Sequence, residues 1–243
     1  ANLLKAKSVN LKTTGKSLQD ELQNVESTLI SIRTQIPNVP DESVPSGNSE
    51  KDNEEVFSAG AIPNLNEHAL PHWELAVKYD LIDFDLGSKI TGAGFPVYKG
   101  KGAKLQRALI QYFLDKNTEA GYAEFQVPHL VNKDSGFGTG QLPDKEGQMY
   151  HIPGDGLYLI PTAEVPLTNF FRNQLLEVKD LPICLTSYTP CFRREAGSYG
   201  ANVRGLNRLH QFDKVEIVRL EEPQNSRDAL DQMVEHVKSI VEE

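Results

Sequence analysis

The sequence contains few cysteines and no long apolar segment. Cys184 and Cys191 are the only thiols among 243 residues, and no Cys or His cluster has C-x2-C spacing. This argues against a disulfide framework and a zinc site; we expect two reduced thiols in an intracellular protein, with Cys191 packing beneath a strand. No run approaches the roughly 20 apolar residues of a membrane span. The first residues, ANLLKAKSVN, lack the apolar core and cleavage site of a secretory signal.

The sequence also lacks an excess of basic residues. Its formal net charge is −9, which argues against nonspecific nucleic-acid binding. The charges are unevenly distributed, however, because residues 1–16 contain four lysines and no acid, whereas residues 41–60 contain six acids and one lysine. A local basic strip of this kind can still bind RNA.

A seven-residue repeat covers residues 4–36. One seam consists of Leu4, Leu11, Leu18, Val25 and Ile32, and the other consists of Ser8, Gly15, Leu22, Leu29 and Ile36. This pattern predicts a coiled-coil helix, at least from Leu18 to Ile36, that Pro37 ends. An amphipathic helix on a globular core is the alternative. A narrow seam needs a partner helix, either from a second copy or from upstream of Ala1, and Ser8 and Gly15 predict a fraying tip.

Composition divides the rest of the chain into a linker and a body. Residues 37–60 are rich in Pro, Ser, Asn and acids, which is typical of a linker. The predicted parts are therefore a helical segment, 1–36, a linker, 37–60, and one large domain, 61–243.

Within this domain, apolar spacing predicts helices around Trp73–Tyr79, over Ala103–Asn117 and from Asn225 or Ser226 onward. The stretch YAEFQVPHL after Gly121 predicts a strand, and the glycine-rich residues 136–152 predict a flexible connection. Gly100 and Gly102 form a G-x-G without the third glycine of a dinucleotide site, so they predict a turn.

The most informative stretch is 188–220, which is expected to form two strands joined by a loop, 196–204. Alternation places on one face of the second strand Arg208, His210, Phe212, Lys214 and Glu216. Arg193 and Glu195 share a face of the first strand in the same way. Such side chains can hold a phosphate, stack on a base and bind an ammonium group, although a solvated sheet face is also ordinary.

The full string FRREAGSYGANVRGLNRLHQFDKVE resembles motif 2 of class II aminoacyl-tRNA synthetases, and specifically that of bacterial-type seryl-tRNA synthetases. Thr162 and Glu164 are two positions apart and are therefore expected to share a strand face. Thr-Ala-Glu at 162–164 is similar to the amino-acid-binding signature of that family. FGTGQLP is similar to a stretch that borders its active site, and the helix around 103–117 with the strand that contains Pro128 resembles motif 1, which builds the dimer interface. The resemblance runs from about Ile36 to the last residue.

This resemblance implies an α/β (α+β) fold, with an antiparallel sheet flanked by helices and preceded by part of a coiled-coil arm. It implies ATP-dependent activation of L-serine and transfer of serine to the 3′ end of tRNA(Ser). It further implies a cytoplasmic homodimer that associates through the catalytic domain. The start of the arm and the motif 3 region are absent from the sequence, so we expect the chain alone to bind ATP poorly or to be inactive. Whether a selenocysteine tRNA is also a substrate is left open.

The resemblance also assigns roles to individual residues. ATP-binding residues are Arg193, Arg194, Glu195, Leu209 and Phe212, and Arg193 is also the catalytic residue. Serine-binding residues are Thr162, Ala163, Glu164, Arg208 and Glu216. Residues expected to bind tRNA are Lys5, Lys7, Lys12, Lys16 and Arg204. The Mg²⁺ that accompanies ATP is expected to have ligands beyond the end of this chain, and no metal ligand is expected within it. His210 and Lys214 receive no role.

Two other functions are compatible with such a chain. A synthetase paralogue could activate a small amino acid for a carrier protein, but such relatives lack the long arm and use zinc. A non-catalytic RNA-binding or regulatory relative would be expected to lose pocket residues, and those of this chain all fit the family pattern.

Overall fold

The computed structural model describes residues 2–195 and 204–243, and the chain divides into two compact units, Ala1–Asn64 and Leu65–Glu243. The first unit consists of helix α1 (Asn2–Arg33), then irregular chain with one 3₁₀ turn, η1 (Glu50–Asp52). Its seam side chains are exposed; Leu11, for example, is 73% exposed.

Helix α1 ends earlier than the heptad pattern predicts. The expected helix reaches Ile36, but α1 stops at Arg33, and the next residues form turns in which the Gln35 N–H bonds the Ile32 carbonyl at 3.0 Å. The prediction of the end was therefore wrong by three residues. The physical reason is Pro37, because a proline disfavours helical backbone at the residue before it.

The second unit contains a long antiparallel pair, β7 (Ile183–Phe192) and β8 (Gln211–Leu220), which align from Ile183–Leu220 to Phe192–Gln211. Strand β3 (Ala123–Glu124) adds to β7 in parallel, so the sheet order is β3-β7-β8. Two smaller antiparallel sheets pair β1 (Ile82–Asp83) with β2 (Val97–Tyr98), and β6 (Leu157–Leu159) with β4 (Leu130–Val131) and β5 (His151–Ile152).

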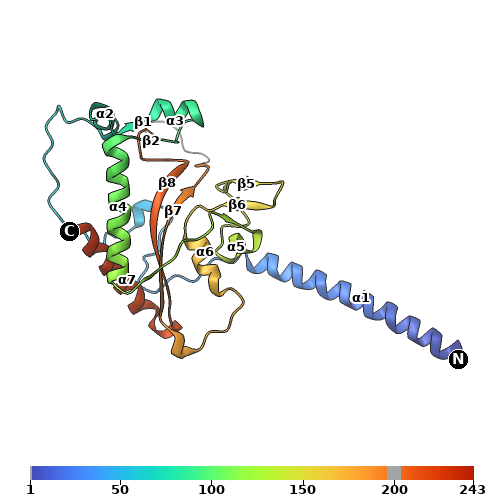
Figure 1. Ribbon diagram of the computed structural model, residues 1–243. Coiled ribbons are helices and arrows are strands. Elements are labelled where there is room, and N and C mark those ends of the chain that lie inside the picture. Colours follow the sequence, from blue (N-terminus) through green and yellow to red (C-terminus); the bar gives the residue numbers. More distant parts are fainter. Residues whose placement is uncertain (1, 196–203) are drawn as a thin grey trace. The chain divides into compact units, whose positions relative to one another are not determined.

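Helices flank these sheets, as the fold prediction requires. They are α2 (His72–Lys78), α3 (Phe84–Ile90), α4 (Gly100–Glu119), α5 (Lys133–Gly138), α6 (Glu164–Thr168) and α7 (Ser226–Glu242), with 3₁₀ turns η2 (Asn169–Phe171), η3 (Val178–Asp180) and η5 (Pro223–Asn225). Figure 1 shows α4 running alongside β7 and β8, with which it is in contact. The predicted fold class is thereby confirmed, apart from the one parallel pair. Within the ranges 2–195 and 204–243, no helix is both long and apolar enough to span a membrane.

The core of the second unit surrounds the short helix α6. Val127, Leu167 and Leu185 form one buried cluster with Ala163. Ile160 and Val165 belong to a second cluster with Val131. The residues on both sides of Thr162 are therefore fixed by apolar burial.

Two predicted strands are interrupted. YAEFQVPHL was expected to form one strand, but β3 and β4 are separate two-residue strands in different sheets. Pro128 lies between them and has no N–H to donate to a sheet. Likewise Thr162 and Glu164 do not share a strand face, because β6 ends at Leu159 and Glu164 begins α6.

Part of the alternation predicted for 188–220 is also wrong. Strand β7 ends at Phe192 and β8 begins at Gln211, so Arg193, Glu195, Arg208 and His210 lie in the connecting segments rather than on strands. Glu195 has a φ of 48°, in the left-handed region, which ends any extended run there. Phe212, Lys214 and Glu216 do lie on β8, as predicted. The predicted mobile loop falls, up to residue 203, outside the described residues.

Candidate active site

Strand β8 provides one side of the candidate site. Phe212, Lys214 and Glu216 alternate along it and therefore project from the same face of the sheet. In the register with β7, Phe212 lies opposite Cys191 and Glu216 lies opposite Ser187, both of which have no exposed surface. Cys191 is therefore packed in the sheet as expected, and its burial raises the pKa of its thiol.

Thr162, Lys214 and Glu216 form a bonded cluster, called below the Glu216 cluster. The Thr162 hydroxyl donates to Glu216 Oε2 at 2.5 Å, and Lys214 Nζ lies 2.5 Å from the same oxygen. Thr162 is 4% exposed and the Glu216 side chain 18% exposed. A largely buried carboxylate with a cation and a hydroxyl on one oxygen keeps its other oxygen for a further donor.

The position of Thr162 follows from the turn that starts α6. The Glu164 N–H donates to Thr162 Oγ1 at 3.1 Å, a short side-chain-to-backbone bond that favours a turn over a strand. Ala163 is fully buried, whereas Glu164 is exposed. The structure therefore brings Thr162 to Glu216 but leaves Glu164 outside the Glu216 cluster.

Arg193 lies between this turn and the Phe212 ring. Its Nε donates to the Pro161 carbonyl at 3.3 Å, and its guanidinium carbon is 5.1 Å from the centre of Phe212. The backbone of Arg193 is fixed by its N–H, which donates to the His210 carbonyl at 3.0 Å. The structure thus places a cation and an aromatic face directly beside the turn that holds Thr162.

Glu195 and Arg208 form a second, more exposed pair. Arg208 Nη1 lies 3.5 Å from Glu195 Oε2, and the two side chains are 56% and 13% exposed. Glu195 also has a left-handed backbone, and uncommon conformations of this kind concentrate at functional sites.

His210 and Tyr150 support the backbone beneath the two arginines. Tyr150 Oη and His210 Nδ1 are hydrogen-bonded at 2.8 Å, and the Phe95 ring is stacked on His210 at 5.3 Å. The His210 N–H donates to the Gly94 carbonyl at 2.9 Å. A side chain on Gly94 would meet His210, since an added Cβ would lie 2.4 Å from its ring. His210, to which the sequence assigned no role, therefore supports the site structurally.

The Arg194 side chain is exposed and lies 5.9 Å from the Tyr150 ring. Its N–H donates to the Gln148 carbonyl at 2.9 Å, which fixes the predicted glycine-rich connection next to the site. Asp144 in turn accepts from the backbone N–H groups of Gln148 and Met149, each at 2.8 Å. That connection is therefore an ordered loop after α5, held by hydrogen bonds.

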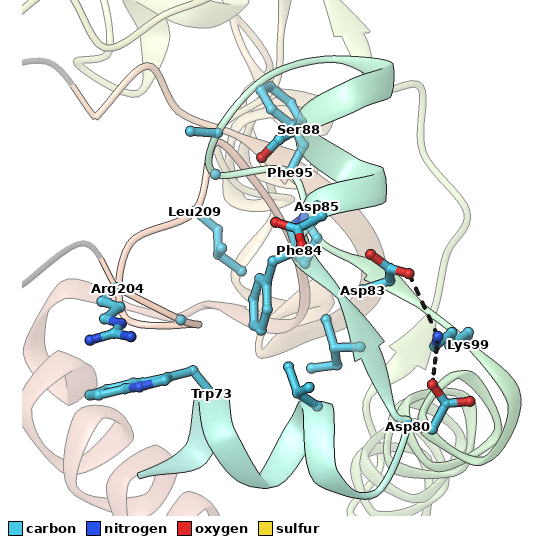
Figure 2. Close-up of a pocket in the computed structure, with 16 residues that line it drawn as sticks. Trp73, Asp80, Asp83, Phe84, Asp85, Ser88, Phe95, Lys99, Arg204 and Leu209 are labelled. Atoms are coloured by element: carbon cyan, nitrogen blue, oxygen red, sulfur yellow. Dashed lines mark ion pairs between the residues drawn. The ribbon is translucent and has the colours of Figure 1, made fainter.

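A cavity of about 520 Å³ lies beside this region, between α2, α3 and the segment that begins at Arg204. Figure 2 shows the Arg204 guanidinium lying over the indole of Trp73, 5.0 Å from its centre, with Leu209 and Phe84 beside this pair in the lining of the cavity. Asp80 and Asp83 pair with Lys99 at its edge (Figure 2). Leu209, which is 7% exposed, lines the cavity.

Helix α2 also bonds the backbone after Arg204, in what we call the α2 contact. His72 Nε2 accepts from the Leu206 N–H at 2.8 Å, and an added Cβ at Gly205 would lie 2.2 Å from the same nitrogen. Gly205, with a φ of 73°, permits both the turn and the close approach. The α2 contact was not predicted from the sequence, because His72 and Leu206 lie far apart in sequence.

Lys214 is the second residue that the sequence reasoning left without a role. The sequence did contain a signal for Lys214, because a residue two positions before Glu216 on the same strand lies on the same face. For metals, the ranges 2–195 and 204–243 contain no group of three His, Cys, Asp or Glu side chains that could hold an ion. The predicted RNA-binding lysines, Lys5, Lys7, Lys12 and Lys16, are exposed on α1 in the first unit.

Comparison with known proteins shows what this chain is similar to. Residues 150–243 match the family described as tRNA synthetase class II core domain (G, H, P, S and T). The chain is 51% identical over 221 residues to a serine–tRNA ligase of Salinibacter ruber, covering 91% of this chain and 52% of that protein. It is 47% identical over 228 residues to the enzyme of Syntrophomonas wolfei, covering 93% of this chain and 53% of that protein. The chain thus spans about half the length of the curated relatives it matches.

Solved structures agree. The fold matches seryl-tRNA synthetase from Pyrococcus horikoshii complexed with ATP, with a TM-score of 0.89, 28% identity, and coverage of 98% of this chain and 57% of that one. It matches cytoplasmic serine–tRNA ligase from Naegleria fowleri in complex with AMP, with a TM-score of 0.83, 26% identity, and coverage of 92% and 54%. The chain is therefore similar in sequence and fold to about half of a serine–tRNA ligase, and its residues 150–243 match the class II tRNA synthetase core domain.

Proposed function

We propose that the protein to which this chain belongs is a cytoplasmic serine–tRNA ligase. It activates L-serine with ATP and transfers serine to the 3′ end of tRNA(Ser). The observation that carries this proposal is the Glu216 cluster, with Arg193 and Phe212 immediately beside it. The cluster suits a small polar ammonium compound, and its neighbours suit a nucleotide.

In the first step, a serine carboxylate oxygen attacks the α-phosphorus of ATP. The new P–O bond forms as the bond from that phosphorus to the bridging oxygen breaks, and pyrophosphate leaves with the electron pair. The carboxylate is already ionised at neutral pH, so the step requires no general base. Catalysis then depends on positioning and on neutralising charge at phosphorus. Arg193 is the proposed catalytic residue, because its guanidinium lies next to both the Thr162 turn and Phe212.

Serine recognition is assigned to the Glu216 cluster. Glu216 has a carboxylate oxygen besides the one that holds Thr162 and Lys214, and it can accept from the serine ammonium or hydroxyl. Ala163 and Glu164 complete the proposed serine-binding segment by their place in the Thr162 turn. Arg208 approaches the substrates from the segment before β8.

Nucleotide recognition is assigned to the neighbouring residues. Phe212 stacks on adenine, Glu195 accepts from its amino group, and Arg194 and the backbone at Leu209 border the nucleotide. ATP and AMP in the structures of similar proteins support this assignment. Mg²⁺ accompanies ATP, but the described residues offer no cluster that fits a metal ion, so no step is assigned to a protein-bound metal.

In the second step, a terminal ribose hydroxyl of tRNA attacks the carbonyl carbon of seryl-adenylate. The ester C–O bond forms as the bond from that carbon to the phosphate oxygen breaks, AMP leaves with the electron pair, and the hydroxyl proton is released to water. RNA contacts are assigned to Arg204 and to the α1 lysines at positions 5, 7, 12 and 16. The protein is proposed to be a homodimer through the domain that includes residues 61–243. Serylation of a selenocysteine tRNA is compatible with the same site, since the amino acid and the nucleotide are unchanged.

The test is ATP–pyrophosphate exchange by the full-length protein with serine, alanine or glycine. We expect exchange with serine alone, followed by serylation of tRNA(Ser). Exchange with alanine or glycine but not serine would favour a paralogue that activates another small amino acid. No exchange with any of the three would leave a non-catalytic relative as the function.

A further inference from the structure

A line of hydrogen bonds lies behind the candidate site and ends at Glu216; we call it the Thr186 network. His236 Nε2 on α7 is 2.8 Å from Asn117 Oδ1 on α4. Asn117 Nδ2 donates to Thr186 Oγ1 at 2.9 Å, and the Thr186 hydroxyl donates to the Glu216 backbone carbonyl at 2.8 Å. Three side chains from α7, α4 and β7 therefore reach one backbone group on β8.

The order of donors in the Thr186 network is determined by its last member. The Glu216 carbonyl can only accept, so Thr186 uses its single hydroxyl proton there and must accept from Asn117. Asn117 then uses its amide nitrogen toward Thr186, so its carbonyl oxygen faces His236. It follows that His236 carries a proton on Nε2 and donates it. Each hydrogen bond in the network therefore has one possible donor and one possible acceptor.

The Thr186 network reaches Glu216 from the opposite side of the sheet. In the β7–β8 register Thr186 lies opposite Ile217, and Ser187 lies opposite Glu216. Because side chains alternate, the Thr186 side chain projects to the face that α4 covers, and the Glu216 carboxylate projects to the other. The network therefore holds the Glu216 backbone from behind, while Thr162 and Lys214 hold its carboxylate in front.

Burial makes these bonds obligatory. Thr186 has no exposed surface and Asn117 is 4% exposed, so water cannot replace a lost partner easily. His236 is additionally stacked on Tyr122, with ring centres 5.7 Å apart. A buried polar group of this kind is stable only when it is fully bonded, and it then fixes one geometry.

We propose that Thr186, Asn117 and His236 are positioning residues that set the place of the Glu216 carboxylate for the substrate ammonium group. This inference rests on the proposed function. It adds that serine affinity depends on residues that never touch serine. Among the described residues, none that we assign to the nucleotide bonds a member of the network, so we expect the ATP affinity to be independent of it.

The test is steady-state exchange kinetics on full-length Thr186→Val, which keeps the shape of threonine and removes its hydroxyl. One uncharged hydrogen bond corresponds to a change of roughly 2- to 10-fold. We expect the KM for serine to rise by about that factor, with the KM for ATP unchanged. Thr186→Ser, which restores the hydroxyl, should return the serine KM toward the original value.

Thr118→Val is the matched control, because the Thr118 hydroxyl donates to carbonyls of its own helix, at Leu114 and Asp115, and makes no bond to the network within the described part of the chain. A fall in kcat for Thr186→Val in proportion to a lost folded fraction, with both KM values unchanged, would show a purely structural role and overturn the proposal. An unchanged serine KM in a folded variant would overturn it as well. If the unaltered protein shows no serine-dependent exchange, the proposed function itself fails, and the inference fails with it.

Discussion

On the proposed serine side of the site, Thr162 is 4% exposed and bonds Glu216 at 2.5 Å. On the proposed nucleotide side, Glu195 pairs at 3.5 Å with Arg208, a proposed serine-binding residue whose side chain is 56% exposed. Buried, short hydrogen bonds resist rearrangement, whereas an exposed ion pair contributes little to stability and can readily exchange its partner. The difference indicates that the chain itself forms the serine side before any ligand binds. We expect the exposed pair of Glu195 and Arg208 to take its final geometry only when the nucleotide binds.

The largest effect is expected for Arg193, which contacts both sides. Arg193→Ala removes the guanidinium that bonds the Pro161 carbonyl and lies over Phe212. We expect serine-dependent exchange to fall about 100- to 1000-fold, as is typical when one charge-stabilising donor is lost. Arg227→Ala is the matched control, since Arg227 lies on α7 in an exposed pair with Asp231. A loss comparable to that of the control would remove Arg193 from the mechanism.

The next change separates the two sides. Glu216→Gln keeps the size of the side chain but removes the charge that faces Lys214 and, in our proposal, the serine ammonium. A hydrogen bond to a charged group corresponds to about 10- to 100-fold, so we expect the serine KM to rise by that factor. The ATP KM should stay within about twofold of the original, because in our proposal Glu216 makes no hydrogen bond to ATP and so less than one uncharged bond is lost. Equal changes in both constants would break the distinction between the sides.

A smaller effect is expected at the α2 contact. His72→Ala removes the acceptor for the Leu206 N–H, close to Arg204, a proposed RNA contact. We expect transfer of serine to tRNA to slow about 3- to 10-fold, with exchange unchanged, because a single uncharged bond is lost. Glu74→Gln, exposed on the same helix, should affect neither step. Slower exchange in His72→Ala would extend the role of α2 to serine activation.

The smallest effect concerns a carboxylate outside both sides. Asp83 accepts from the Leu86 N–H at 2.8 Å, and this bond, with the nearby Lys99 ammonium, lowers the pKa of Asp83. A lowered folded-state pKa gives stability that is present above the unfolded value of about 3.9 and is lost as pH falls through the folded value. Asp83→Asn keeps a side-chain acceptor for the Leu86 N–H at the start of α3, but the asparagine amide does not titrate. The unfolding midpoint of the original protein should therefore fall relative to the variant below about pH 4. A difference between the two unfolding midpoints that stays the same at every pH would contradict this prediction.

Local pattern predicted much of the fold and part of the site. Helical spacing located α4 and α7, and period-two alternation located Phe212, Lys214 and Glu216 on one face of β8. These features depend only on neighbours in sequence. The pairing of Thr162 with Glu216 could be expected only from family resemblance, because the two residues are 54 positions apart.

The failures have local and long-range causes. Thr162 was placed on a strand, but its hydroxyl accepts the Glu164 N–H and starts a helix. Glu195 was placed on a strand, but it has a left-handed backbone, which a glutamate seldom adopts. The bond from His72 to Leu206 spans 134 positions, and no periodicity within either segment indicates it.

The central claim is that the chain itself forms the serine side, whereas the nucleotide arranges the pair of Glu195 and Arg208. Amide hydrogen exchange of the full-length protein, with and without ATP, tests it most directly. We predict that the amides around Thr162 and Glu216 are protected without ATP and change little. The amides of Glu195, Arg208 and Leu209 should gain protection when ATP binds. Equal gains in both regions, or weak protection around Glu216 without ATP, would contradict the account.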